Sequence, residues 1–468
     1  MNKFKALKDD QLFLLPPSVE DFIPESHLAR VIDEIVDGLD TSIIEDAYSE
    51  LGQKSYHPKI VLKLLIYGYA TGTVSGRKIA AKCESDTAYM FLASMYRPDF
   101  RTINDFRKDN IGYFKKCFVD VIKICQQLQM VRIGTIALDS TKIQPNAAAN
   151  RTKDKEGYQR WLNETAEQIQ KIIEHAEQIN QQEDKEHGSF RGDELPEELR
   201  QKQHLKLKIQ SVLAQIKEEE KVNLTDTDAR VMKDRSGFNS NYNCQAATTL
   251  EGIIVGAYVS TSASDKAQLL PLIDQVQENT NETVMVALAD RGYSSYENYE
   301  KLEEQNITAY IPDQEEHLQA TRKADIFDRS NFAYNQQNDY YICPQGKKLH
   351  FERVYEHKKK KQKSRVYTTK DCFICPLKQA CTKGNRRYIH RELREPLREK
   401  ARQRLDTWEG KALYRKRMQS IEPIWGNLKE NKKIRRFNLR GKEKVNAEFL
   451  LHCLSHNITK IYKHKTAA

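Results

Sequence analysis

The first quarter of the chain, residues 1–128, is patterned for α-helices. Apolar residues recur at intervals of three and four in residues 27–40 and 57–72, which is the spacing of an amphipathic helix. The second of these segments has Pro58 near its start and Gly72 at its end, and both residues favour those positions in a helix. The pattern predicts a helical N-terminal region.

Several polar residues of this region are candidates for helix caps and for DNA contacts. Ser75 and Thr102 stand where their hydroxyl groups would cap the helices that follow. Arg77 and Lys78 would lie in the first turn of one helix, with Arg107 further along. Short helices joined by tight turns are typical of helix-turn-helix DNA readers. A plain helical bundle with a basic surface fits the same pattern, and both interpretations stay open here.

Two apolar runs rich in β-branched residues each lead to an aspartate. Residues 133–143 read IGTIALDSTKI, and residues 284–293 read VMVALADRGY. Such runs predict strands that are buried on both faces, with Asp139 and Asp290 at their carboxyl ends. Ligands and chemistry collect at that end of an open α/β sheet. The two runs therefore predict a pair of carboxylates at one edge of a sheet.

The elements around these strands predict a mixed sheet covered by helices, an α+β or α/β fold. Two β-runs in residues 241–260 flank Glu251 and Gly252, a turn of hairpin type. Ser264 and Ser294 stand before helical patterns, and residues 307–312 resemble a short strand.

Between the first strand and this hairpin, residues 158–221 predict two long polar helices. Each carries a narrow apolar stripe at helical spacing, and the expected turn lies at residues 185–193. A stripe of this kind predicts an antiparallel coiled-coil hairpin. We interpret it as an inserted structural arm that takes no part in the chemistry.

Four of the nine cysteines fall in residues 313–400, a basic stretch without clear periodicity: Cys343, Cys372, Cys375 and Cys381. The second and third form a C-x-x-C pair, and four sulfurs arranged in this way are typical of a closed, structural zinc site. Reduced cysteines without a metal are the alternative interpretation. The other cysteines lie singly in apolar contexts and are expected to be reduced core residues.

The last part of the chain predicts a helix with an acid among basic residues. Residues 410–432 place apolar side chains on one helical face, and Glu422 precedes Pro423. Proline inside the pattern predicts a kink or a new first turn at this point. A further apolar helix closes the chain.

Composition narrows the partners of the protein. The 468 residues carry a formal net charge of +10, which alone is weak evidence for a polyanionic partner. The distribution is more informative, because Lys and Arg crowd residues 347–440 whereas acidic clusters fall mostly in residues 163–227. This asymmetry indicates a C-terminal half that faces nucleic acid. The chain has no apolar run long enough to span a membrane and no secretory h-region, so a cytoplasmic protein is expected.

A third acid decides what the two aspartates are for. Two aspartates on strands and Glu422 on a helix laid across the sheet would concentrate negative charge that divalent cations neutralise. Oxygen ligands of this kind favour Mg²⁺ or Mn²⁺. A pair of such ions stabilises the attacking and leaving oxygens of a phosphodiester displacement. Asp228 and Asp265 are rival acids in polar loops, and we rank them below these three.

At this point the chain resembles the DDE transposases of bacterial insertion sequences, whose catalytic core has an RNase H-like fold. The resemblance rests on ALDSTKI, YNCQAATT, ADRGYSS, CPLKQAC and IEPIWGNLK, and it covers nearly the whole chain. It implies a helical DNA-binding domain in residues 1–128 and a catalytic core in residues 129–157, 222–312 and 401–464. The helical hairpin of residues 158–221 and the cysteine-containing residues 313–400 would be insertions.

The resemblance also implies roles for individual residues. Asp139, Asp290 and Glu422 would be the metal-binding triad, and Lys429 would contact a DNA phosphate. The related signature has Tyr seven residues and Arg four residues before the glutamate. This chain has Arg415 and Met418 there, and Tyr414 and Arg417 are each displaced by one position. These basic and aromatic residues, together with Arg291, Arg77 and Lys78, are the expected DNA contacts.

The sequence thus predicts a transposase that cleaves DNA at element ends and joins it to a target, with two Mg²⁺ or Mn²⁺ ions and a structural Zn²⁺. Its partner would be double-stranded DNA, and the resemblance implies a homodimer on paired ends. A non-catalytic DNA-binding regulator derived from a transposase is the alternative from a different class. A general metal-dependent nuclease is a third interpretation.

Overall fold

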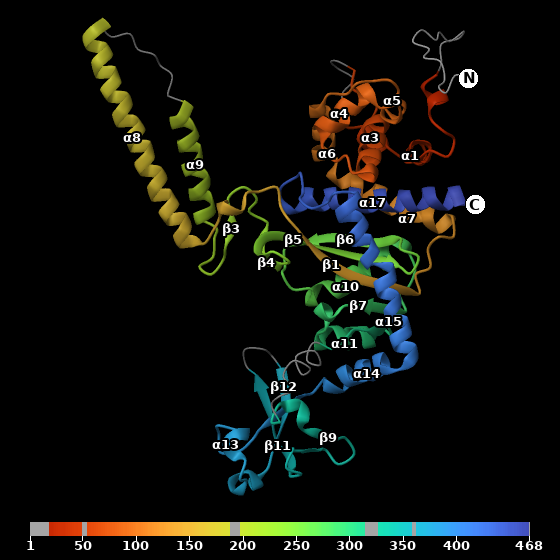
Figure 1. Cartoon of the computed structure of the whole chain (residues 1–468), viewed down its shortest axis with the longest axis vertical. Helices are drawn as coiled ribbons and strands as arrows, with labels where there is room; N and C mark the ends of the chain where they lie inside the picture. Colours follow the sequence, from red (N-terminus) through yellow and green to blue (C-terminus); the bar gives the residue numbers. More distant parts are fainter. Residues whose placement is uncertain (1–17, 49–53, 188–196, 314–325, 358–361, 468) are drawn as a thin grey trace, which may run out of the picture.

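The protein is a mixed α+β structure, as the pattern predicts. The computed structural model describes residues 18–48, 54–187, 197–313, 326–357 and 362–467. A central sheet lies below a group of N-terminal helices, a long helical hairpin projects to one side, and a small β-subdomain lies at the far end (Figure 1). Within the described residues, no helix combines the length and the apolar character needed to cross a membrane.

The central sheet is mixed, and five of its strands run in the order β6-β5-β1-β7-β8. β5 is antiparallel to both β1 and β6, whereas β7 is parallel to β1 and β8 is parallel to β7. The strands are β1 (Thr135–Ile143), β5 (Gly237–Thr249), β6 (Ile254–Ser260), β7 (Val286–Ala289) and β8 (Thr308–Tyr310). The expected hairpin is confirmed, with Gly252 in a left-handed conformation (φ 80°) at its turn.

The first strand is longer than its apolar run. Asp139 lies inside β1, not at its end, because the residues that follow it continue to pair with β5 as far as Ile143 opposite Tyr242. The parallel partner β7 stops earlier, at Ala289. Asp139 therefore lies where one neighbouring strand ends and the other continues.

The first half of β5 carries the sheet outward toward the helical hairpin. It pairs with β4 (Arg230–Asp234), which pairs with β3 (Val222–Asn223), and this strand pairs with β2 (Thr152–Lys153). The hairpin helices α8 (Lys155–His187) and α9 (Glu197–Leu213) begin and end at this extension. Figure 1 shows them projecting from it side by side.

The two hairpin helices differ in length from the prediction. α8 begins at Lys155, before the predicted start at residue 158, and α9 ends at Leu213, well before residue 221. At the base of the hairpin a separate small core forms around Tyr158, Ile209 and Val212. The turn predicted at residues 185–193 lies mostly outside the described residues, and coiled-coil packing stays a prediction.

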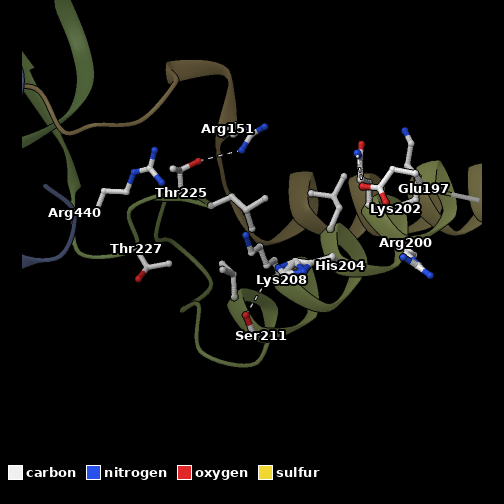
Figure 2. A pocket seen from close by; sticks show the side chains of 14 residues that line it. Arg151, Glu197, Arg200, Lys202, His204, Lys208, Ser211, Thr225, Thr227 and Arg440 are labelled. Atoms are coloured by element: carbon white, nitrogen blue, oxygen red, sulfur yellow. Dashed lines mark hydrogen bonds between the residues drawn. The ribbon is translucent and has the colours of Figure 1, made fainter. Parts of the chain in front are cut away.

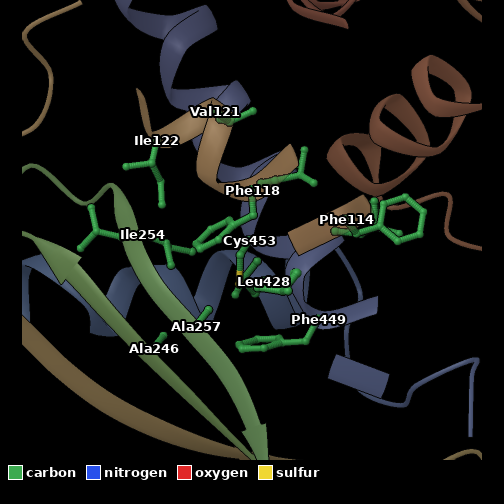
Figure 3. Packing of buried hydrophobic residues seen from close by; sticks show 14 of the residues in the cluster. Phe114, Phe118, Val121, Ile122, Ala246, Ile254, Ala257, Leu428, Phe449 and Cys453 are labelled. Carbon is green, nitrogen blue, oxygen red and sulfur yellow. The ribbon is translucent and has the colours of Figure 1, made fainter. Parts of the chain in front are cut away.

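Helices cover both faces of the central sheet. α10 (Leu269–Thr280) packs on one face, where a side chain at Gly256 would meet Val276 at 2.8 Å. On the other face, α17 (Lys442–Ala467) packs against β6, and α7 (Ile111–Gln127) packs on α17. Figure 3 shows Phe118 of α7 and Cys453 of α17 meeting Ala257 of β6.

The N-terminal helices share their hydrophobic core with the sheet. One buried cluster runs from Ile23 to Ile461 and includes side chains of the N-terminal helices, the sheet and α17. The helices before α7 are α1 (Leu28–Asp37), α2 (Ser42–Glu45), α3 (Pro58–Thr71), α4 (Gly76–Ser85), α5 (Thr87–Leu92) and α6 (Phe100–Asp109). The predicted domain boundary near residue 128 stays a prediction.

The helix expected from Thr102 onward is divided and begins earlier. Asp99 caps α6, since its carboxylate accepts a hydrogen bond from the Arg101 amide at 2.7 Å, and Thr102 lies inside this helix. The chain breaks at Asn110, where φ is −104° and ψ is 33°, before α7 begins. The predicted limits of α3 are confirmed, with Pro58 in its first turn and Gly72 as a left-handed cap.

The β-subdomain is a five-stranded antiparallel sheet in the order β13-β12-β11-β10-β9. Phe332, Tyr341, Leu349, Tyr367 and Ile389 form its core. Its strands are β9 (Ala333–Asn335), β10 (Tyr340–Ile342), β11 (Lys348–His357), β12 (Gln362–Thr368) and β13 (Ile389–Glu392).

Two helices bring the chain back from this subdomain to the central sheet. α14 (Glu395–Asp406) packs on α11 (Tyr296–Glu304), where Arg394 and Arg404 form ion pairs with Glu300 and Glu303 at 3.2 and 3.3 Å. α15 (Trp408–Ser420) then crosses β1 and β7. This path brings α15 alongside the two aspartate-bearing strands (Figure 1).

Candidate active site

Two aspartates lie side by side where β7 ends. Leu138 pairs with Ala289 in the parallel ladder, so the next residues, Asp139 and Asp290, are neighbours across the two strands. Asp290 begins a short 3₁₀ turn, and its carboxylate accepts a hydrogen bond from the Gly292 amide at 2.9 Å. The structure thus brings together the two carboxylates that the apolar runs predict.

Burial makes both carboxylates harder to ionise. The side chain of Asp139 is only 16% exposed, and burial raises its pKa to about 6, helped by the charge of Asp290 and opposed by Arg417. Burial also raises the pKa of Asp290, against the effect of Arg417 and with a contribution from Asp265. Two partly desolvated like charges favour the approach of a cation.

Arg417 of α15 lies between the carboxylates. One guanidinium nitrogen is 3.6 Å from an Asp139 oxygen, and the other terminal nitrogen is 3.7 Å from a Glu422 oxygen. Two nitrogens of this buried guanidinium have no hydrogen-bond partner among the described residues. The group also lies 5.7 Å from the ring centre of Tyr414. Arg417 is therefore a resident positive charge at the site, held by electrostatics more than by hydrogen bonds.

Glu422 opens a new helix, as expected from Pro423. α15 ends at Ser420, and α16 (Glu422–Gly426) starts with the proline in its first turn. The Glu422 side chain is 47% exposed, whereas Trp425 is buried and its indole N–H donates to an Asp139 oxygen at 3.2 Å. The tryptophan thus fixes α16 against β1 and leaves the glutamate facing solvent beside the site.

Lys429 also reaches the first strand. It lies in a π-helical turn, Asn427–Asn431, that continues α16, and its ammonium group donates to the Thr141 hydroxyl. Burial lowers its pKa, and the Asp139 charge opposes this effect. The ammonium group of Lys429, which is predicted to contact a phosphate, therefore lies beside Thr141, two residues along β1 from Asp139.

The three predicted acids surround Arg417 and do not share one point. Within the described part of the chain, no three His, Cys, Asp or Glu side chains lie close enough together to hold a metal ion as a group. Asp139 and Glu422 each approach a different nitrogen of Arg417. The arginine explains the separation, because it occupies the position between them.

A fourth acid, ranked low from the sequence, also lies beside Asp290. A side chain at Gly292 would lie 3.0 Å from an Asp290 oxygen and 3.2 Å from an Asp265 oxygen. The other Asp265 oxygen accepts hydrogen bonds from the buried amides of Asn243 and Gln245 at 2.7 and 2.8 Å. Polar residues in the buried strand β5 were the signal that could have found it. The second rival, Asp228, has a structural role, because it accepts from the Lys442 amide at the start of α17 at 2.8 Å.

The other predicted DNA contacts are spread over the molecule. Arg291, directly after Asp290, and Arg415, two residues before Arg417 on α15, are both exposed. Arg77 and Lys78 are exposed on α4 in the N-terminal helical region, which Figure 1 shows well apart from α15. Arg107 is not available to DNA, because it is buried and donates to the Tyr69 hydroxyl and to a backbone carbonyl, each at 3.0 Å.

The four predicted zinc ligands line one small cavity of about 30 Å³ in the β-subdomain: Cys343, Cys372, Cys375 and Cys381. All four are free thiols with partly exposed side chains. The Cys343 sulfur accepts a hydrogen bond from the Lys347 amide at 3.3 Å. Burial raises the pKa of Cys381, which Arg387 opposes and the other three cysteines reinforce. The fold thus gathers the four sulfurs, although they do not form a group with metal-site spacing in the described residues.

Comparison with known proteins assigns the two ends of the chain. A family model described as "Transposase DDE domain" matches residues 342–462, which include Glu422 and Lys429. A second model, described as "Transposase domain (DUF772)", matches residues 17–109, which include Arg77 and Lys78. No curated protein and no solved structure matches the chain. Taken with the geometry of the site, the two matches support a DDE transposase of an insertion element.

Proposed function

We propose that this transposase cleaves DNA strands at the ends of its element and transfers them to a target, with Asp139, Asp290 and Glu422 as metal ligands. The convergence of β1, β7 and the α15–α16 junction on one electrostatically coupled group carries the proposal. The strand order β6-β5-β1-β7-β8, with its antiparallel first three strands, supports an RNase H-like core.

The donor chemistry of the site fits Mg²⁺ or Mn²⁺. The candidate ligands are carboxylate oxygens, which these ions prefer, and burial and mutual repulsion disfavour the charged aspartates in the absence of a cation. A pair of such ions, when bound, would activate water and stabilise the leaving oxygen of a phosphodiester. Arg417 would have to leave its position between Asp139 and Glu422, where bound cations would replace its positive charge.

The positive residues around the carboxylates would hold the DNA backbone. Lys429 is half-buried beside Thr141, where its ammonium group can meet a phosphate close to Asp139. Arg415 and Arg291 are exposed at the rim and can neutralise flanking phosphates. Tyr414 stacks near Arg417 and would orient it toward a phosphate once it leaves Asp139. Charge neutralisation and positioning supply the catalysis, and no protein nucleophile is required.

The reaction we propose has two in-line displacements. Water attacks a phosphodiester at the element end, the bond from phosphorus to the 3′ oxygen breaks, and a 3′-hydroxyl remains. That hydroxyl then attacks a phosphodiester of the target strand at the same carboxylates. Its oxygen forms the new bond to phosphorus, and the 3′ oxygen of the target strand leaves as a 3′-hydroxyl. The protein would act as a homodimer on paired ends, and the exposed Arg77 and Lys78 would contact the element end.

We also propose that the four-cysteine cavity holds one structural Zn²⁺. Thiolates favour zinc, and a structural ion fixes small loop-rich segments that have little hydrophobic core. The cavity is small, its four sulfurs come from three separate chain segments, and the subdomain core contains few residues. This ion would hold the β-subdomain in shape and take no part in DNA cleavage.

A cleavage assay on element-end DNA tests the proposed function. Labelled duplexes from the DNA on either side of the coding region are incubated with purified protein and Mn²⁺ or Mg²⁺. A transposase produces nicks that leave 3′-hydroxyls at one defined end and then joins them to a target plasmid. A regulator would shift the duplex on a gel and cut nothing, and a general nuclease would cut without joining. Either of those outcomes contradicts the proposal.

A further inference from the structure

An open groove lies at the base of the helical hairpin, away from the catalytic carboxylates. Its volume is about 800 Å³, and it is bounded by α9, by the loop after β3 and by the segment that precedes α17. Figure 2 shows side chains from these three parts facing the same space. Nothing in the proposed reaction uses this groove.

The groove is lined by positive charge. Its basic residues are Arg151, Arg200, Lys202, His204, Lys208 and Arg440, and Glu197 is the one acidic residue among the described residues that line it. The surrounding hairpin is rich in glutamate, so the basic character of this face is a local feature. Such a concentration of one sign of charge in a concave surface attracts a polyanion.

The positive groups are not engaged in ion pairs with the rest of the described chain. Arg151 donates to the Thr225 hydroxyl at 3.3 Å, Lys202 to the Gln168 side chain at 2.6 Å, and Arg440 to the Asn146 carbonyl at 2.9 Å. All of these acceptors are neutral. The charges are therefore available to a ligand without the loss of an internal salt bridge.

The spacing on α9 suits an extended anion. Arg200, His204 and Lys208 follow one another at intervals of four, so they lie on one face of the helix. At 1.5 Å per residue, this row is about 12 Å long. A DNA duplex carries one charge per about 1.7 Å of its axis, so the row can meet several phosphates. A single small anion would use only a part of it.

The groove is linked to the catalytic strand by a short basic path. After β1, Gln144 pairs with Arg436, and Asn146 accepts the Arg440 side chain. The chain then reaches Arg151 inside the groove. Arg436 and Arg440 are exposed, so positive side chains follow the chain from the end of β1 to the hairpin.

We propose that this groove binds the phosphate backbone of duplex DNA, which makes the helical hairpin a DNA-holding arm and not only a structural one. The inference rests on the proposed function, because it assigns a second contact for the same DNA. The duplex held at the carboxylates would continue past Arg436 and Arg440 to α9. Backbone contacts of this type carry no sequence preference, so the arm would add affinity and orientation.

Equilibrium binding of a labelled duplex to the full-length protein tests the groove. The variant Arg200→Gln/Lys208→Gln removes two charges that line it, and Arg160→Gln/Lys171→Gln removes two exposed charges from α8 outside it. Each lost phosphate contact lowers the slope of log affinity against log salt by about 0.9. The groove variant should therefore bind about 10- to 60-fold more weakly at about 0.1 M salt, with a slope lower by up to about 1.8.

The control variant should stay within about twofold of the wild type, because distant surface charges are screened at this salt concentration. Unchanged affinity in the groove variant would overturn the inference. Equal losses in both variants would also overturn it, since the effect would then be one of net charge. A groove that binds polyglutamate but contributes nothing to DNA affinity would be a site for an acidic protein, which contradicts the inference as well.

The two proposals fail in different ways. If the protein binds DNA through the groove but makes no nicks with Mn²⁺, the groove proposal stands and the proposed function is contradicted. If the groove variant nicks element ends at saturating DNA and binds DNA as tightly as the wild type, the groove proposal is contradicted and the proposed function stands.

Discussion

Replacement of Asp139 by asparagine should stabilise the metal-free protein at neutral pH. The carboxylate is buried beside Asp290, and its pKa is raised from the ordinary value of 3.8 to about 6 even with Arg417 close by. The folded state therefore holds a proton there more tightly than the unfolded chain does. Asparagine has nearly the same shape, can still accept the Trp425 hydrogen bond, and carries no charge to bury.

The size and the sign of the effect follow from linkage. A tenfold change in proton affinity corresponds to about 1.4 kcal/mol. Ionisation of Asp139 therefore lowers the free energy of unfolding of the wild type by about 3 kcal/mol at most. The stabilisation from the bound proton is fully present below pH 3.8 and is lost as the pH rises through about 6. Because part of the shift belongs to the pair of aspartates, we expect the asparagine variant to gain about 1 to 3 kcal/mol at pH 8. The gain should be much smaller near pH 4.

Thermal unfolding in a chelating buffer, with and without added Mg²⁺, measures this effect. The variant should melt several degrees higher than the wild type at pH 8 in chelator, at about 2 °C per kcal/mol. Mg²⁺ at about 100 times its dissociation constant should stabilise the wild type by about 2.7 kcal/mol and the variant much less. Asp274→Asn on the exposed face of α10 is the control and should change neither result. A variant that is less stable than the wild type at every pH, or equal stabilisation of both by Mg²⁺, would refute the reasoning.

Two further predictions concern the cysteine cavity and a glycine cap. The purified protein should contain about one zinc per chain by elemental analysis. The variant Cys372→Ser should lose this zinc, and the control Cys125→Ala should keep it. A wild-type protein that is prepared without chelator and contains no zinc would contradict the proposed site. Gly72→Ala should destabilise the protein by about 1 to 3 kcal/mol in chemical unfolding, because φ is 76° and the added carbon would lie 2.5 Å from the Asn431 carbonyl oxygen. Gly38→Ala should be neutral, because its backbone is right-handed and the added carbon would lie no closer than 3.5 Å to another residue's atoms. An equal loss in both variants would contradict this reason.

The sheet and its carboxylates could be predicted because local signals identify them. Apolar β-branched runs mark β1 and β7, a glutamate-glycine turn marks the β5–β6 hairpin, and Pro423 marks the start of α16. Periodicity depends on which faces are buried, and these elements are buried as the pattern requires. The sequence does not show that Asp139 lies beside Asp290, because this depends on the parallel register of β1 and β7.

Features that depend on tertiary contacts could not be predicted from the sequence. Arg107 carries a surface-type side chain, yet it is buried because Tyr69 and a carbonyl satisfy it. The break at Asn110 has no proline to mark it, and the nearest glycine, Gly112, lies inside α7. Asp265 lies in a polar loop, and its place beside Asp290 is determined by the amides of β5. For Arg107 and Asp265 the partners are distant in the sequence.

Arg417 shows what sequence spacing alone leaves out. It stands one position away from the arginine of the related signature, and the spacing gave no reason to place it at the carboxylates. The chain turn between α15 and α16 brings its guanidinium between Asp139 and Glu422. A positive charge at this point also explains why the three acids do not form a ready metal site.

The most direct test of the account is metal-dependent cleavage of element-end DNA by the Asp290→Asn protein. Asp290 is positioned by its strand and by the Gly292 amide, so asparagine should preserve the fold and the DNA binding. We predict that this variant shifts the labelled end like the wild type and produces no nicks with Mg²⁺ or Mn²⁺. Glu422→Gln should behave in the same way. Wild-type cleavage by the purified Asp290→Asn protein would contradict the assignment of these carboxylates to the reaction.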